Sequence, residues 1–432
     1  MSRPVEAVRP GARPALGWAA VTTYGAQVAV AVLGLANVLV IARSLGPDGR
    51  GDVAFLTAVA WLIAFCFTLS AHEAMANRAS TRPEERPQLA GGAVVLALVL
   101  GLPGAATAYL AVHYVPFLRL DVDGPAFAAA LASIPVLILQ MYLSYLVRAA
   151  HAVGVANVAL VATALGVAAN ATLAALGLLT SRNAVFVWAV AQLLSALVLG
   201  AYLVRRLGSI RLPDRVLVQR LLRFAIRAHG AGLTNSVTYR IDSWILGAVA
   251  GPHQLGIYSV AVAWFEGLFL LPQALVMALR PTIARSSDEE AGRLAGRGCA
   301  LSLAVTAALG VLLYLAAPLL CVGVFGAEFR ESVPLLRLLI PGALGIATLK
   351  ILGNALTARG RPWLESAASG CAFGVAVILY LAAIPHFGAV GAAVASTVAY
   401  LIGGGTAAVL FNRTLGRGRR APAATAPGQV LR

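Results

Sequence analysis

The stretch ALGWAAVTTYGAQVAVAVLGLANVLVIA, residues 15–42, contains no charged side chain. A helix rises about 1.5 Å per residue, so about 20 such residues cross the roughly 30 Å hydrocarbon core of a bilayer. Similar apolar windows recur along the chain as far as Phe411. Of the 432 residues, only 12% are charged, compared with about 25% in a soluble domain. The sequence therefore predicts an all-α membrane protein.

The apolar windows predict about twelve transmembrane helices. We place them near residues 15–42, 52–76, 90–115, 124–147, 152–179, 183–204, 223–250, 254–279, 297–323, 333–357, 362–384 and 388–411. An even number of spans leaves both termini on one side of the membrane. Arginine is concentrated in the loops on that side, so the positive-inside rule predicts cytoplasmic termini.

The longest internal loop divides these spans into two predicted six-helix lobes. The expected order is a cytoplasmic tail (1–14), a lobe (15–204), a basic cytoplasmic loop (205–222), a second lobe (223–411) and a basic cytoplasmic tail without fixed structure (412–432). An offset of 205 residues aligns Gly46-Pro47 and Gly51 with Gly251-Pro252 and Gly256. Two copies with the same orientation are related by a pseudo-twofold axis along the membrane normal, which predicts a central cleft between the lobes.

The same hairpins carry a resemblance to a known family. The segment ARSLGPDGRGD, residues 42–52, is similar to the "AR-x-LGP-x-x-x-G" hairpin of polysaccharide flippases in the MATE-like (MOP) transporter superfamily. YRIDSWILG, residues 239–247, followed by GPHQLGIY, residues 251–258, resembles their "R-x-D-x-x-x-L-G … LG-x-Y" segment. Length, span count and layout agree over the whole chain, whereas specific matches are confined to these hairpins.

The resemblance implies the O-antigen or lipid-linked oligosaccharide flippase family. Such a carrier moves a polyprenyl-diphosphate-linked glycan from the cytoplasmic to the outer leaflet of the bacterial cytoplasmic membrane, for cell-surface polysaccharide assembly. Transport would proceed by alternating access of the two lobes. The expected partners are the lipid-linked glycan, membrane lipids and other polysaccharide-assembly proteins, and no nucleic acid.

Cationic residues inside the spans are the candidate substrate site. A charge in the membrane costs roughly 2.5–3.5 kcal/mol on insertion scales and therefore usually faces a cavity or a partner. Arg227, His229, Arg240 and Lys350 are expected to bind the diphosphate. A guanidinium offers several donors to phosphate oxygens. The alternatives are a salt bridge between helices for Arg240 and snorkelling toward the cytoplasm for Lys350.

Acidic residues and the ends of spans give two further sets of candidates. Asp242 and Glu266 could couple transport to a proton or sodium gradient, or could pair within the structure. His72, Glu73 and Arg148 could line the cytoplasmic mouth, or could anchor helix ends at the interface.

The sequence does not predict an enzyme. It contains no Walker motif, no HExxH and no convincing nucleophile–base pair, and no cofactor or metal is expected. The alternatives within transport are a multidrug or ion antiporter and a peptidoglycan lipid-precursor flippase of the same superfamily. From another class, a membrane-embedded glycan polymerase or ligase would require a large extracytoplasmic loop, and no loop is long enough.

Overall fold

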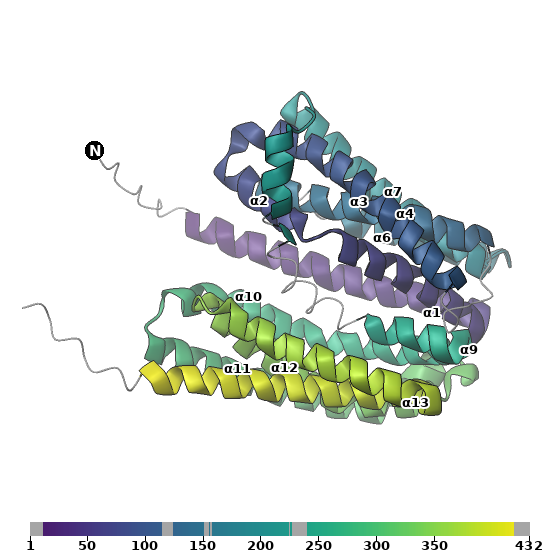
Figure 1. Ribbon diagram of the computed structural model, residues 1–432. Helices are drawn as coiled ribbons and strands as arrows, with labels where there is room; N and C mark the ends of the chain where they lie inside the picture. The colour runs from purple at the N-terminus through teal and green to yellow at the C-terminus, as the bar shows by residue number, and fades with distance from the viewer. Residues whose placement is uncertain are drawn as a thin grey trace, which may run out of the picture. The chain divides into compact units, whose positions relative to one another are not determined.

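The computed structural model describes residues 12–114, 124–150, 155, 158–223, 225–226 and 240–418. Within these ranges the regular secondary structure is helical (Figure 1), and eight helices are long and apolar enough to cross a membrane. The predicted all-α membrane fold is confirmed, while the count of twelve spans stays a prediction.

The chain forms two compact units. The first unit comprises Met1–Ala263 and Cys321–Ser332, and the second unit comprises Trp264–Leu320 and Val333–Arg432. Helices of the first unit are α1 (Ala12–Phe67), α2 (Ala71–Thr81), α3 (Arg86–Tyr114), α4 (Gly124–Ala149), α6 (Val158–Ala175), α7 (Ser181–Leu207) and most of α9 (Ile241–Glu266). Helices of the second unit are α10 (Leu270–Arg285), α11 (Asp288–Pro318), α12 (Ser332–Ala358) and α13 (Pro362–Gly418). The predicted lobe boundary at 205–222 stays a prediction.

Three of these helices are each interrupted by a glycine at a predicted hairpin. Gly46 in α1 has φ 65°, Gly251 in α9 has φ 83° and Gly388 in α13 has φ 53°. Glycine reaches positive φ without steric cost, so the helix can change direction there. Each of these elements therefore includes residues of two consecutive predicted spans.

The predicted span 52–76 is interrupted after Phe67. A turn at Thr68–Ser70 follows, with positive φ at Leu69 (49°) and Ser70 (57°), and α2 begins at Ala71. Thr68 is fully buried, and its backbone oxygen accepts a hydrogen bond of 2.9 Å from the Tyr142 hydroxyl of α4. The Thr68 oxygen also accepts a hydrogen bond of 3.0 Å from the Ala71 N–H, so this buried carbonyl at the break has two donors.

The predicted span 254–279 is also divided. A 3-10 turn, η3 (Gly267–Phe269), separates α9 from α10. Pro272 lies in the first turn of α10, where a missing N–H costs no helical hydrogen bond. A separate helix, α10, therefore begins at Leu270, within what the sequence predicted as one continuous span.

Candidate functional site

The helical parts of α9 before and after the break at Gly251, here called its two arms, are joined through a buried carboxyl group. Asp242 is 3% exposed and accepts hydrogen bonds of 2.7 Å from the Tyr258 hydroxyl and 2.6 Å from the Ser243 backbone N–H. Asp242 and Tyr258 lie on opposite sides of the break at Gly251. This arrangement favours the structural alternative for Asp242, because its oxygens are engaged in holding the two arms together.

Arg240 lies two residues before Asp242 and has a different environment. It occupies the turn that precedes α9 and is exposed, whereas the neighbouring carboxyl is buried. Two other predicted phosphate-binding residues, Arg227 and His229, lie outside the described residues. Arg240 is therefore the predicted phosphate-binding residue that lies in the described part of the first unit.

Lys350 lies on α12 in the second unit and is partly buried. Its Nζ donates a hydrogen bond of 3.2 Å to Oε1 of Gln273 on α10, and Asn354 Nδ2 donates one of 3.0 Å to the Lys350 backbone oxygen. Glu365, in the first turn of α13, acts on the ammonium electrostatically and accepts a hydrogen bond from Thr357. The ammonium is thus positioned by a neutral amide from a neighbouring helix.

The second ion-coupling candidate, Glu266, is the last residue of α9 and is partly buried next to the η3 turn. It belongs to the second unit, whereas Asp242 belongs to the first. The two acidic candidates therefore have separate surroundings, and each is a separate target for mutation.

The predicted cytoplasmic-mouth residues include a contact that the sequence did not indicate. His72 on α2 is 5% exposed, and its ring packs edge-on against Tyr145 of α4 with centroids 4.5 Å apart. The Arg148 guanidinium lies 5.7 Å from the centroid of the same Tyr145 ring. Glu73 is exposed. Tyr145 precedes Arg148 by three residues, so the i, i+3 spacing on one helix face was the available signal.

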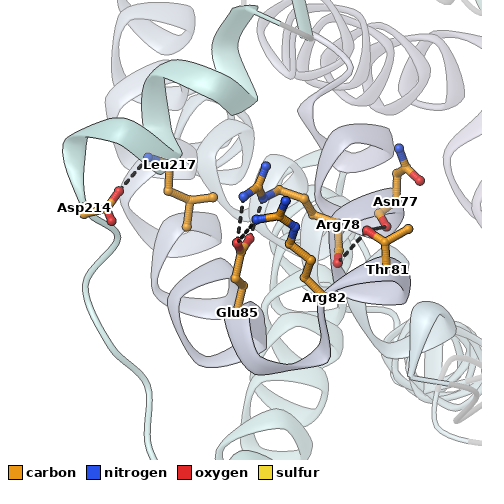
Figure 2. A network of polar contacts seen from close by, with 7 residues as sticks. All are labelled: Asn77, Arg78, Thr81, Arg82, Glu85, Asp214 and Leu217. Carbon is orange, nitrogen blue, oxygen red and sulfur yellow. Dashed lines mark hydrogen bonds and ion pairs between the residues drawn. The ribbon is translucent and has the colours of Figure 1, made fainter. Parts of the chain in front are cut away.

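The end of α2 and the η1 turn (Pro83–Glu85) that follows it form a charged corner of the first unit, which we call the α2 corner. Figure 2 shows Arg78 and Arg82 converging on Glu85, with a bond of 2.7 Å from Arg78 Nη2 to Glu85 Oε1. The hydrogen bond that Arg78 donates to Glu85 raises the pKa of Arg78, which keeps the guanidinium charged.

The predicted basic loop, residues 205–222, is bonded next to the α2 corner by a backbone hydrogen bond. The Arg211 N–H donates a hydrogen bond of 3.1 Å to the Pro87 oxygen. Asp214 accepts one of 2.6 Å from the Leu217 N–H and caps a helical segment (Figure 2). Leu217 and Leu221 are buried, while Arg215 and Arg220 of that segment are exposed. The segment thus packs its apolar face on the protein and turns its arginines outward.

The two Gly-Pro-x3-Gly hairpins pack against each other reciprocally within the first unit. A Cβ placed on Gly51 would lie 1.8 Å from the Pro252 oxygen, and one on Gly256 would lie 1.9 Å from the Pro47 oxygen. An exchange of contacts of this kind is expected from the pseudo-twofold relation that the sequence repeat predicts, and the relation itself stays a prediction. The last glycine of each motif is required because the partner backbone occupies the space of a side chain.

Comparison with protein families matches the polysaccharide biosynthesis protein family over residues 18–287. Comparison with curated proteins gives no match. Solved structures with the same fold include the inward-facing conformation of a multidrug resistance MATE family transporter of the MOP superfamily (15% identity, TM-score 0.70, covering 91% of this chain and 96% of that chain). Another is the lipid II flippase MurJ in its inward closed conformation (11% identity, TM-score 0.73, covering 91% and 87%).

A third similar structure is a MOP superfamily transporter from Pyrococcus furiosus Vc1, described as having a binding pocket of reverse polarity (15% identity, TM-score 0.62, covering 93% of this chain and 95% of that chain). At these identities the likeness concerns the fold. The family match covers more than half of the chain, and the sequence-based assignment is confirmed. The chain is a multi-pass membrane protein that belongs to the polysaccharide biosynthesis protein family and shares its helical fold with solved transporters of the MOP superfamily.

Proposed function

We propose that the protein flips a polyprenyl-diphosphate-linked oligosaccharide from the cytoplasmic to the outer leaflet of the bacterial cytoplasmic membrane. Alternating access of its two predicted lobes would carry the glycan across, with both termini in the cytoplasm. The family supports a glycan as cargo. The fold, shared with a MATE transporter and a lipid II flippase, supports transport as the activity.

The observation that carries the proposal is the position of Lys350. It is the only lysine in the sequence, lies on a helix apolar enough to span the membrane, and donates to the neutral side chain of Gln273. A cation in a membrane-spanning helix is costly and is retained where it serves function. A diphosphate is a suitable ligand, because its oxygens accept hydrogen bonds from an ammonium.

A second cation, Arg240, would contact the cargo from the first unit. Its side chain is exposed, and a guanidinium offers several donors to phosphate oxygens. Transport would draw on a proton or sodium gradient through Glu266, or on downstream consumption of the glycan. No cofactor is required by this scheme.

The test is transport by the wild-type protein in vesicles loaded with one substrate at a time. Each of three substrates represents one candidate transport function: a polyprenyl-diphosphate oligosaccharide, a peptidoglycan lipid precursor and an organic cation of the multidrug class. We expect translocation of the first above that in protein-free vesicles. Transport of the peptidoglycan precursor alone would support the second candidate, which the MurJ-like fold favours, and transport of the organic cation alone would support the antiporter.

A further inference from the structure

A cavity of about 90 Å³ lies inside the first unit among α1, α4, α6 and α7. We call it the amide cavity, because four of its polar lining residues carry carboxamide groups. Its polar lining consists of Asn37, Gln140, Thr163, Asn170, Gln192 and Ser195. The indole of Trp188 is also part of the lining. Arg240 and Lys350 are absent from this lining.

Two side-chain oxygens of the lining are buried and lack protein donors. Asn170 is 1% exposed, and its Nδ2 donates a hydrogen bond of 2.8 Å to Asn37 Oδ1. Within the described part of the chain, Asn170 Oδ1 and Gln140 Oε1 have no hydrogen-bond partner. A buried acceptor without a donor is destabilising. The cavity is therefore suited to an occupant that supplies hydrogen-bond donors.

The chemistry of the lining limits what that occupant can be. The described residues around the cavity include no carboxylate, arginine, lysine or histidine, so an ion bound there would keep an uncompensated charge inside the membrane. Carboxamides both accept and donate hydrogen bonds, as sugar hydroxyl groups do. An indole offers an apolar surface to the C–H face of a sugar ring. A neutral polyhydroxylated group fits all three features.

The size of the cavity sets how much of a glycan it can hold. A water molecule needs roughly 15 Å³ of such space, so the volume of about 90 Å³ accommodates about six waters. Hydroxyl groups along one edge of a single sugar ring would replace those waters. A complete oligosaccharide is too large for this volume, so the cavity has room for one unit of it at most.

We propose that the amide cavity is a subsite for one neutral sugar unit of the transported glycan, held by Gln140 and Asn170 and packed against Trp188. This inference rests on the proposed flippase function and names a second point of contact for the cargo. Recognition of the sugar is thereby separated from recognition of the diphosphate.

The experiment measures binding of free monosaccharides by the full-length protein in lipid nanodiscs, without sugar-based detergents that would compete. The probes are glucose, galactose and N-acetylglucosamine, and the signal is the tryptophan fluorescence that is lost in Trp188→Phe. The test variant is Gln140→Met, which keeps the side-chain length and removes the unpaired acceptor. We expect at least one sugar to bind and its Kd to rise about tenfold in Gln140→Met, with unchanged or increased thermal stability.

The matched control is Ser133→Ala on the same helix. Ser133 is 2% exposed, and its hydroxyl donates to the Ala129 oxygen of α4 itself (2.8 Å), so this variant should bind sugar like the wild type. If no probe binds the wild type, or if Gln140→Met binds as tightly, the cavity holds water only and the proposal is wrong. A Gln140→Met protein that is markedly less stable would assign Gln140 a structural role and would also overturn it.

Failure here is distinguishable from failure of the flippase proposal. Binding of a free sugar requires neither a diphosphate nor translocation, so a protein that flips lipid-linked glycan but binds no sugar refutes the subsite alone. Sugar binding that survives in Lys350→Ala would show that the amide cavity acts independently of the cationic residues, as proposed.

Discussion

Replacing Gly51 by alanine is expected to force apart the two Gly-Pro-x3-Gly hairpins. The hairpins join the arms of α1 and α9 within the first unit, at the glycines where both helices change direction. Gly51 faces the backbone of Pro252, and Gly256 faces the backbone of Pro47. The perturbation therefore acts on one contact of a reciprocal pair.

The magnitude follows from the position of the added carbon. The new Cβ would lie 1.8 Å from the Pro252 oxygen and 2.5 Å from its carbonyl carbon, whereas ordinary van der Waals contact begins at 3.4 Å. Both obstructing atoms are backbone, so no side-chain rotation relieves the clash. Overpacking of this kind costs about 1–3 kcal/mol and occasionally more. We expect Gly51→Ala to lose at least about 2 kcal/mol of stability.

The assay is thermal unfolding of the purified protein in lipid nanodiscs, followed by intrinsic fluorescence. Gly34→Ala on the same helix is the control, because a Cβ there has no neighbour within 4 Å. Alanine in a helix interior is favoured over glycine by about 1 kcal/mol, so this variant should be at least as stable as the wild type. Gly256→Ala should resemble Gly51→Ala, since its Cβ would lie 1.9 Å from the Pro47 oxygen.

The reasoning would be refuted if Gly51→Ala unfolded at the same temperature as Gly34→Ala. The hairpins would then be separated in the native protein, and the spacing of the motif would need another explanation. Loss of stability in both hairpin variants, with none in the control, would support the reciprocal contact.

Two further predictions concern side-chain contacts of the first unit. Tyr258→Phe removes the donor at 2.7 Å from buried Asp242 and should lower stability by about 1–3 kcal/mol. An unchanged midpoint of thermal unfolding would contradict the proposed link between the arms of α9. Arg78→Ala removes the donor at 2.7 Å from Glu85, a pair whose side chains are 20% and 18% exposed, and should cost about 1 kcal/mol. The loss should be smaller in high salt, because ions screen the pair, and an equal loss at both salt concentrations would contradict its electrostatic origin.

Much of the helical layout could be predicted because lipid imposes a simple rule on sequence. Long uncharged stretches such as residues 15–42 indicate helices, and Gly46-Pro47 and Gly251-Pro252 indicate where these turn. The break after Phe67 was not predicted, since the predicted span 52–76 runs through it. Part of its support lies outside the segment, in the Tyr142 hydroxyl that donates to the Thr68 carbonyl.

For the candidate sites, too, the sequence predicted individual charged residues but not the distant residues that contact them. Charge inside a span drew attention to Asp242 and Lys350, but their partners Tyr258 and Gln273 lie 16 and 77 residues away. The sequence did not indicate that the carboxamides of the amide cavity form a site, because neutral polar residues are common in membrane helices. Packing of four helices is what brings them together.

The most direct test of the central claim is the rate at which reconstituted protein translocates a polyprenyl-diphosphate oligosaccharide when its cations are removed. If Arg240 and Lys350 contact the diphosphate, Arg240→Ala and Lys350→Ala should each slow flipping roughly tenfold or more, because hydrogen bonds to charged groups contribute about 1.5–3 kcal/mol. Lys350→Arg, which keeps the charge, should retain most of the activity. Flipping by both alanine variants at the wild-type rate would contradict the account.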